Sequence, residues 1–178
     1  MIKLPPNFKV CKYGIEARLC EIADAEFILS VRTDTHHTRF IHSTENDLNK
    51  QIEWIKKYKE RESEGREYYF IFSKANNPFG MSRVYNIFEY YGTSGSWLCK
   101  PNNDPKDSIA TYLLMHDIMF GEMGLDLLIF DVRKENKKVW RMHESFGAVR
   151  IGESDLDFYF SLFKDTYYLK RDKYVELF

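Results

Sequence analysis

The stretch LLIFDVRKENKKVWRMHESFGA, from Leu127 to Ala148, decides the fold that we expect for this chain. Its first four residues form a continuous apolar run that is too short for an independent helix. They predict a strand buried on both faces, in a parallel or central position of a sheet. A polar segment follows, and apolar residues then recur at helical spacing from Val139 onward. Gly147 at the C-cap position ends this helix, and a new strand begins at Ala148.

Two polar side chains in this stretch are candidate functional groups. Asn136 sits where the strand gives way to the helix, and His143 follows seven residues later, two turns along roughly the same side. An amide at a strand end and a titratable ring on the next helix can both face a cleft at that strand end. The alternative interpretation is structural, with Asn136 as a helix N-cap and His143 as a half-exposed helix residue.

The spacing of Val132, Asn136, His143, Gly147 and Ala148 resembles the second conserved motif of the GCN5-related N-acetyltransferases (GNAT). It is most similar to the branch that contains ribosomal-protein N-terminal acetyltransferases and bacterial amino-sugar acetyltransferases. The family usually has Tyr in place of His143 and Phe in place of Ala148. The resemblance implies the α+β acyl-CoA N-acyltransferase fold, in which helices flank a mixed, mostly antiparallel central sheet of about seven strands in three layers.

The composition places the chain in the globular class, with 44% hydrophobic and 30% charged residues. A length of 178 residues without repeats or a linker suits one domain over 1–178. A net charge of −1 argues against a nucleic-acid partner, and we find neither a membrane span nor a signal peptide. Three cysteines without metal-ligand spacing predict reduced thiols in a cytoplasmic protein. We expect no metal site, and either a monomer or a homodimer.

The remaining elements follow from periodicity and turn residues. After a loose lead-in at 1–14, we expect strands at 15–22, 68–73, 80–90, 94–99 and 158–163, and helices at 25–32, 45–64 and 109–122, with a helical or irregular end at 165–178. Asp24 and Asp104 are expected N-caps, with Pro105 in the first helical turn, and Ser43 or Thr44 starts the long helix. The turn at 75–78 predicts a hairpin between the second and third strands.

The resemblance also implies a donor site for acetyl-CoA. In the family the fourth strand splays from the fifth, and the pantetheine arm lies in the gap, which here is lined by Trp97, Leu98 and Cys99. A backbone amide of Leu98 or Cys99 is the implied oxyanion donor, and Asn136 orients the pantetheine or the thioester. The pyrophosphate sits on the N-terminus of the next helix, which implicates Lys106, Ser108, Ile109, Ala110 and Thr111.

The turn before that helix departs from the family pattern. The family motif is Gln or Arg, two residues, Gly, one residue, then Gly or Ala, and only the last position, Ala110, matches here. Asp104 and Asp107 would place carboxylates beside a pyrophosphate, a contact between like charges that Lys100 and Lys106 can offset. Acetyl-CoA remains the expected acyl donor.

The implied reaction is direct attack of a neutral amine on the thioester, which needs an oxyanion donor and an acid for the departing thiolate. His143 takes the place of the family's Tyr acid. An imidazolium, with an ordinary pKa of ~6.5, is a stronger acid than a phenol with a pKa of ~10, so the replacement is chemically tolerable. Glu89 is a candidate base acting through water, with a surface carboxylate as the alternative.

The acceptor is expected to be a small-molecule primary amine. In the family, one wall of its site is the loop after the first helix, which makes Arg32, His36, His37 and Arg39 candidates for substrate contact. An amino sugar or nucleotide-linked amino sugar is favoured, since guanidinium groups bind phosphate and aromatic rings stack on bases and sugars. The alternatives are an acetyltransferase of protein N-termini and a non-catalytic domain of the same fold that has lost acyl-CoA binding.

Overall fold

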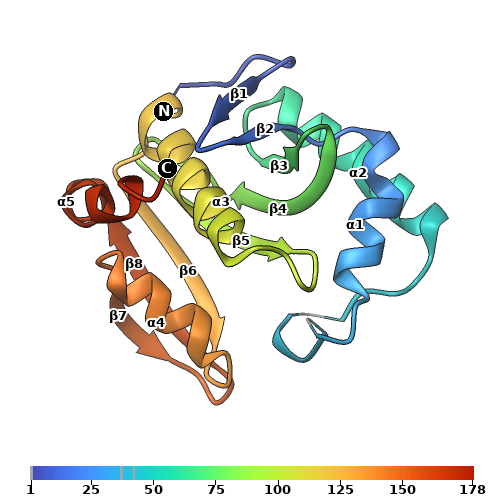
Figure 1. Cartoon of the computed structure of the whole chain (residues 1–178). Coiled ribbons are helices and arrows are strands. Elements are labelled where there is room, and N and C mark those ends of the chain that lie inside the picture. The colour runs from blue at the N-terminus through green and yellow to red at the C-terminus, as the bar shows by residue number, and fades with distance from the viewer. Residues whose placement is uncertain (1, 37, 42) are drawn as a thin grey trace.

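The fold, seen in a computed structural model that describes residues 2–36, 38–41 and 43–178, is built on one mixed sheet. Its eight strands lie in the order β1-β2-β3-β4-β5-β6-β8-β7. Neighbouring strands are antiparallel except for β5 and β6, which are parallel. The expected fold class is confirmed, with eight strands in place of about seven, and helices flank the sheet (Figure 1).

The elements have the following bounds. The strands are β1 (Lys9–Lys12), β2 (Ile15–Leu19), β3 (Tyr68–Lys74), β4 (Asn77–Tyr85), β5 (Tyr91–Cys99), β6 (Leu127–Arg133), β7 (Val149–Glu153) and β8 (Asp157–Phe163). The helices are α1 (Ala25–Arg32), α2 (Leu48–Ser63), α3 (Pro105–Asp117), α4 (Lys137–Ser145) and α5 (Lys164–Val175), with short helical turns at Ile22–Asp24, Thr38–Phe40 and Ile118–Glu122. Within the described residues, no helix has the length and apolarity that a membrane crossing requires.

Two buried clusters attach the helices to opposite faces of the sheet. On β3, Phe70 packs in the cluster that contains α3 and Tyr167 of α5, whereas its neighbour Ile71 packs in the cluster that contains α1 and α2. Both strand residues are fully buried. Side chains alternate across a strand, so an aromatic run that is buried throughout needs a helical layer on each face. This arrangement gives the three expected layers.

The N-terminal half of the sheet differs from the sequence predictions in two places. The expected loose lead-in contains β1, which pairs with β2 through a turn at Tyr13 and Gly14, both with positive φ. The expected strand at 80–90 ends at Tyr85, because Asn86 adopts a φ of +47° that interrupts an extended strand. Residues 86–90 form a loop, and β5 begins at Tyr91, three residues before the strand that we expected at 94–99.

Helix starts are confirmed in one case and corrected in two. Asp104 caps α3 as predicted, although the helix begins at Pro105 and not near residue 109. Asp47, and not Ser43 or Thr44, caps α2 by accepting a hydrogen bond from the Lys50 amide at 3.1 Å. The carboxylate of Asp24 does not cap α1, because it pairs with the guanidinium group of Arg18 at 2.7 Å.

Strand β6 is central, as predicted, because it lies between β5 and β8. It is not buried on both faces: Leu128 and Phe130 are buried, but Leu127 and Ile129 are partly exposed. The reason is that the buried cluster of α1 and α2 involves β3, β4 and β5 and does not extend over β6. The predicted end of the following helix at Gly147 is confirmed, with a φ of +97°.

The parallel strands β5 and β6 separate after a short pairing. Only Tyr91–Thr93 of β5 pairs with Leu127–Ile129 of β6, although both strands continue for several residues. Figure 1 shows their C-terminal ends diverging. A bulge adds to the separation, since β5 carries an extra residue opposite β4 near Ser96, which has a φ of +51°. The expected splay between these strands is therefore present.

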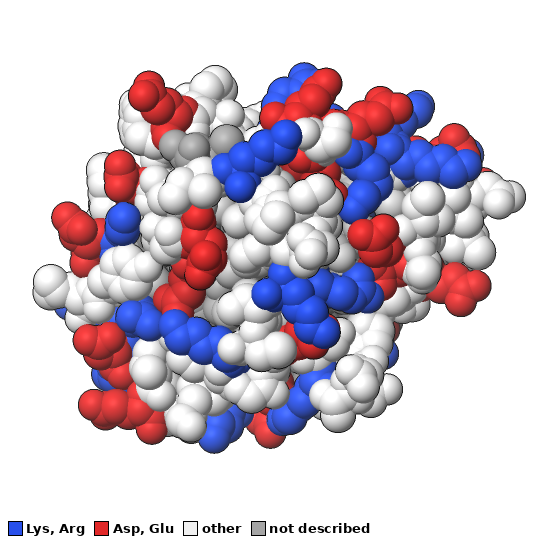
Figure 2. Space-filling model, turned by 90° about the horizontal axis from the view of Figure 1, so that it is seen from above, with Lys and Arg blue, Asp and Glu red and all other residues white. Residues whose placement is uncertain are grey.

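The charged surface mixes both signs. Figure 2 shows basic and acidic side chains interspersed over the face seen from above, as a net charge of −1 leads one to expect. Many of these groups form ion pairs, such as Lys50 with Glu45 at 2.6 Å, and an exposed pair contributes only ~0–1 kcal/mol. The basic groups that bear on function lie instead inside the cavity described next.

Candidate active site

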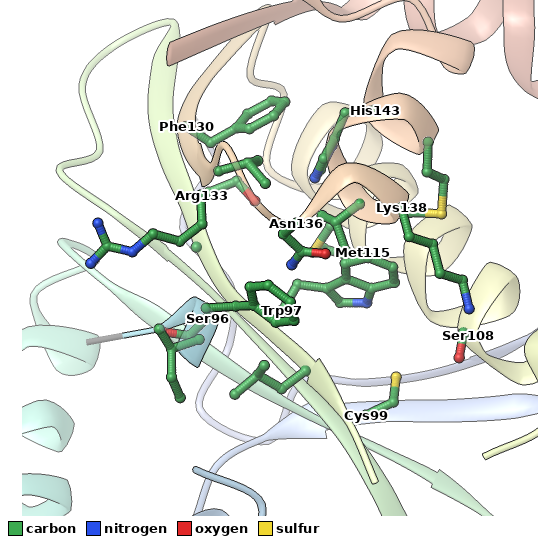
Figure 3. A pocket seen from close by; sticks show the side chains of 18 of the residues that line it. Ser96, Trp97, Cys99, Ser108, Met115, Phe130, Arg133, Asn136, Lys138 and His143 are labelled. Atoms are coloured by element: carbon green, nitrogen blue, oxygen red, sulfur yellow. The ribbon is translucent and has the colours of Figure 1, made fainter. Parts of the chain in front are cut away.

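A cavity of about 780 Å³ opens where β5 and β6 diverge. Figure 3 shows Trp97 and Asn136 in its middle, Lys138 and Ser108 toward one end, and Arg133 toward the other. Its walls come from β5, the start of α3, the end of β6 and helix α4. The volume lies within the ~300–1,000 Å³ that is typical of sites for small-molecule ligands.

Asn136 presents its side chain to this cavity. It occupies the N-cap position of α4, but its side chain makes no capping hydrogen bond. The backbone carbonyl of Asn136 instead accepts from the amides of Val139 at 3.1 Å and Trp140 at 3.2 Å. The side chain points into the cavity (Figure 3). A purely structural capping role therefore does not describe the Asn136 amide.

His143 lies in the cavity wall and is 6% exposed, so the alternative of a half-exposed surface residue is wrong. Its Nδ1 is 3.0 Å from the Tyr112 hydroxyl, and its ring centre is 4.3 Å from that of Phe130. Burial, and to a lesser degree the charge of His116, lowers the pKa of His143 to about 3. The expected imidazolium is therefore also wrong, because the ring is neutral at pH 7.

The β5 side of the cavity contains Trp97, Leu98 and Cys99, as the resemblance implies. The Trp97 indole N–H donates to Thr111 Oγ1 at 2.9 Å, and the Thr111 hydroxyl donates to the Ser108 carbonyl at 2.8 Å. These bonds fasten the strand to the first turns of α3. Burial raises the pKa of the Cys99 thiol, so this side chain is protonated at neutral pH.

The carboxylates at the start of α3 are engaged by groups of the protein. Asp104 accepts from the Lys106 amide at 2.8 Å. Asp107 is 9% exposed and pairs with Lys74, whose Nζ lies 2.7 and 2.9 Å from its two oxygens. The charge of Asp107 is thus balanced within the fold, which weakens the repulsion that we expected toward a pyrophosphate.

The residues predicted around this helix start divide into two groups. Ser108 and Ile109 line the cavity. Ala110 and Thr111 are fully buried behind it, so their backbone and side chains do not line the opening. Lys106 does not line the cavity, and its ammonium lies 5.0 Å from the ring centre of Phe178.

Sequence reasoning missed Lys138, which lines the cavity. Figure 3 shows its chain extending toward Ser108. The Ser108 hydroxyl also accepts from Asn103 Nδ2 at 3.1 Å. The only signal in the sequence was that Lys138 follows closely after Asn136, and lysines on a short helix are usually solvated.

The opposite end of the cavity contains Arg32, as predicted. Its Nε donates to Thr44 Oγ1 at 2.8 Å and its Nη1 approaches Ser96 Oγ at 3.5 Å. Arg83 and Arg133, which sequence reasoning did not assign, line the same end. Arg83 pairs with the buried Glu67, and Arg133 donates to Asp157 at 2.9 Å.

The other predicted acceptor residues do not line the cavity. His36 bonds to Asp34 at 2.9 Å, and the guanidinium group of Arg39 lies 4.4 Å from the ring centre of Phe40. His37 falls outside the described residues. The loop still forms part of the wall, because Phe40 and Ile41 line the cavity in place of the polar residues.

Glu89, the expected base, does not line the cavity. It is exposed in the loop before β5, whereas the cavity lies at the C-terminal end of that strand. Sequence analysis placed Glu89 near the end of a strand, but β4 ends at Tyr85, so Glu89 lies in the following loop. A different carboxylate, Asp131 of β6, lines the cavity, and after burial its charge is the next cause that raises the pKa of Tyr85.

Comparison with known proteins agrees with this geometry. The chain matches the family described as "Acetyltransferase (GNAT) domain" over residues 15–149. No curated protein sequence matches it. Among solved structures, apo FdhC, described as a nucleotide-linked sugar GNAT, is 32% identical, with a TM-score of 0.83 and coverage of 94% of this chain and 97% of that one.

Two more distant structures share the fold. The ribosomal-protein-S5-alanine acetyltransferase from Vibrio fischeri is 16% identical, with a TM-score of 0.77 over 89% of this chain and 98% of that one. The spermidine N-acetyltransferase from Vibrio cholerae, in complex with CoA and spermine, is 17% identical, with a TM-score of 0.74 over 88% and 99%. The family match and the 32% identical structure go further: the chain belongs to the GNAT family and is an N-acetyltransferase that takes its acetyl group from acetyl-CoA.

Proposed function

We propose that the acceptor is the primary amine of a nucleotide-linked amino sugar, acetylated in the cavity between β5 and β6. The observation that carries this proposal is Arg32. Within the described part of the chain its guanidinium group is held by hydroxyl groups, among them those of Thr44 and Ser96, and it forms no ion pair with a carboxylate. Its positive charge is therefore available to a phosphate group, for which a guanidinium is well suited.

The charges around the cavity favour an anionic acceptor over a polyamine. The basic side chains that line it are Arg32, Arg83, Lys100, Arg133 and Lys138, and the acidic ones are Asp131 and Asp157. A polycation would meet repulsion from this excess of basic groups, whereas a diphosphate would be attracted. The ring of Tyr85, 5.0 Å from the Arg83 guanidinium, offers a surface on which a base or sugar can stack.

We propose that acetyl-CoA binds at the end of the cavity formed by α3 and α4, opposite Arg32. We place the pantetheine arm along β5 beside Trp97, and the pyrophosphate between the start of α3 and Lys138. Two positive groups support this placement of the pyrophosphate: the N-terminus of α3, with its partial positive charge, and Lys138. In addition, the ion pair with Lys74 balances the negative charge of Asp107. The non-catalytic alternative draws on the departure of residues 105–110 from the family motif. Two contacts weaken it: Asp107 pairs with Lys74, and Asp104 accepts from the Lys106 amide.

The reaction follows from these positions. The neutral amine attacks the thioester carbonyl carbon, a C–N bond forms, and the C–S bond breaks. We assign Asn136 to orienting the thioester, and the backbone amide of Leu98 or Cys99 to the oxyanion. Asp131 takes the place of Glu89 as the base that accepts the amine proton through water, because it lines the cavity.

Among the remaining acceptors, a protein N-terminus is the main competitor. The V. fischeri neighbour carries that activity in its name, but at 16% identity it supports the fold alone. The FdhC structure, at twice that identity, is described as a nucleotide-linked sugar GNAT. Together with the charge of Arg32, this favours the nucleotide-linked sugar.

The test is a rate comparison with acetyl-CoA and release of free CoA thiol as the signal. The acceptors are a nucleoside-diphosphate-linked amino sugar, the same amino sugar without its nucleotide, spermidine, and a peptide with an N-terminal alanine. We expect the nucleotide-linked sugar to exceed the free sugar by ~10–100-fold in kcat/KM, the contribution of one or two charge-assisted phosphate contacts.

The control uses two arginines of the same loop region. Arg32→Gln should remove most of the preference for the nucleotide-linked sugar, because it deletes the phosphate contact. Arg39→Gln should leave the preference intact, since Arg39 lies on Phe40 outside the cavity. Equal rates with and without the nucleotide, or a preference for the peptide, would show that the acceptor assignment is wrong.

A further inference from the structure

The feature that goes beyond this function is the hydrogen bond between Tyr112 and His143. We propose that Tyr112 is a positioning residue that holds His143 in the Nε2–H tautomer. The Nε2–H group then donates a hydrogen bond to the sulfur of the leaving thiolate. The catalytic part of this inference rests on the proposed function, and the tautomer can be measured without it. Tyr112 lies on α3 and His143 on α4, so the bond joins two elements that form the cavity.

The direction of this bond follows from the surroundings of the Tyr112 hydroxyl. The side chain is fully buried, and the rings of Phe146 and His116 lie 4.4 Å and 4.1 Å from its own. Among the described residues, the hydroxyl has one hydrogen-bond partner, His143 Nδ1 at 3.0 Å. If Nδ1 carried the proton, the phenol hydrogen would be buried without an acceptor, which is costly. The hydroxyl therefore donates, and Nδ1 accepts.

The second ring nitrogen faces the cavity. Across the described residues, the buried side-chain nitrogen and oxygen atoms that lack a hydrogen-bond partner are His116 Nε2, Asp157 Oδ1 and Arg171 Nε. His143 Nε2 is not among them and makes no hydrogen bond within that part of the chain, so it reaches the open space. Figure 3 shows the ring extending from α4 into the cavity above Asn136. The proton that Tyr112 excludes from Nδ1 therefore points at the ligand.

This geometry suits a neutral imidazole. As the C–S bond breaks, negative charge collects on sulfur, and an N–H donor aimed at that atom stabilises it. The imidazole keeps its proton. Asp131 accepts the proton of the attacking amine through water, and that proton then passes through water to the sulfur, so the step balances. The wrong tautomer would aim a lone pair at the developing charge and oppose the reaction.

The experiment measures the tautomer by long-range ¹H–¹⁵N correlation of the histidine rings in the full chain. The His143 signals are those missing from His143→Gln. We expect Nε2–H on His143 in the wild type, and a mixture or a reversal in Tyr112→Phe. His116 serves as an internal reference, because its Nδ1 lies 2.8 Å from the Tyr112 carbonyl and must donate to it, which fixes the opposite tautomer.

Kinetics of the same variants test the catalytic part. Tyr112→Phe should lower kcat by about tenfold with little change in KM for acetyl-CoA, since a bond formed only in the transition state is lost. Tyr167→Phe is the control, because it deletes another buried hydroxyl that bonds to α3, at Leu113, without touching His143. It should leave the tautomer and kcat unchanged.

Three results would overturn the inference: Nδ1–H in the wild type, an unchanged His143 tautomer in Tyr112→Phe, or an unchanged kcat after the tautomer has shifted. A wild type that binds acetyl-CoA but acetylates none of the four acceptors contradicts the proposed function. In that case the spectra alone decide whether Tyr112 fixes the tautomer.

Discussion

At the residue scale, two buried histidines make the folded protein sensitive to acid. Burial lowers the pKa of His143 to about 3 and of His116 to about 4, against ~6.5 for an unfolded chain. Below pH 6.5 the unfolded state therefore binds more protons than the folded state. Stability is retained above pH 6.5 and is lost as the pH falls toward 4, by ~1.4 kcal/mol per pH unit for each ring.

We expect the free energy of unfolding of His143→Gln to fall less than that of the wild type between pH 7 and pH 5. The difference should be about 2 kcal/mol, because one titrating ring has been removed. Urea unfolding of both proteins at the two pH values measures it. The comparison is between pH-dependent losses, so a change in absolute stability caused by the substitution does not matter. Equal losses would mean that His143 is not held neutral by burial.

Sequence reasoning identified some residues of the site and missed others for a physical reason. Asn136 and His143 stand at recognisable spacing in a motif, and both face the cavity. Tyr112 is one aromatic residue among many on a buried helix, and its position against His143 depends on how α3 and α4 pack. The protonation state of His143 was mispredicted for the same reason, since burial is a property of the fold.

At the element scale, residues from the first turns of α3 and α4 line the end of the cavity where we place the donor. We expect Lys138→Ala to weaken CoA binding by about tenfold, the value of one charge-assisted hydrogen bond to phosphate. Lys106→Ala should have little effect, because that side chain lies on Phe178 outside the cavity. Isothermal titration calorimetry with CoA at two salt concentrations measures both, and the Lys138 contribution should shrink at high salt.

Equal weakening by the two lysine substitutions would contradict the placement of the pyrophosphate. A loss confined to Lys106→Ala would restore the expectation drawn from the sequence, which assigned Lys106 to the cofactor. The salt dependence distinguishes a lost charge interaction from a change in conformation, because salt screens charges and does not act on packing.

Element ends were the least predictable part of the fold. The start of α3 was readable because Asp104 and Pro105 are strong local signals for a helix N-terminus. The end of β4 and the bulge in β5 depend on positive φ values at Asn86 and Ser96. Ser rarely adopts a positive φ, so the bulge could not be predicted from the residue type. These two errors moved Glu89 into the predicted site and kept Arg83 out of it.

At the scale of the whole molecule, the sheet consists of two parts joined by the short β5–β6 pairing. A donor bound in the gap contacts both parts and should stabilise the fold as a unit. At 100 times its dissociation constant a ligand adds ~2.7 kcal/mol, which corresponds to about 5–10 °C in the unfolding midpoint for a protein of this size. We expect acetyl-CoA to give such a shift.

Hydrogen exchange with and without CoA locates the effect. Protection should rise in residues 94–99 of β5 and 105–111 of α3, which border the gap. The edge strand β7, whose five residues are all exposed, should not change and serves as the control region. Protection that spreads evenly over the chain, or that avoids β5, would contradict a ligand seated between the two parts.

The overall fold was predictable because its signals agree along the chain. Hairpin turns, a buried aromatic strand and the strand–turn–helix of Leu127 to Ala148 all favour one mixed sheet, and resemblance to a family supplied the order of the elements. Strand β1 was not predictable, because KVCK is mostly exposed at the sheet edge and shows no alternation. Which side chains meet in the cavity depends on the divergence of β5 from β6, which no local pattern encodes.

The protonated state of Cys99 has a consequence for the lifetime of the bound donor. Thioesters pass their acyl group readily to thiolates, and this sulfur lines the cavity in which we place the donor. Because burial raises its pKa, Cys99 remains a thiol at neutral pH and is a poor nucleophile. A protonated Cys99 therefore does not take the acetyl group from a bound donor, and the thioester stays intact until an acceptor amine binds.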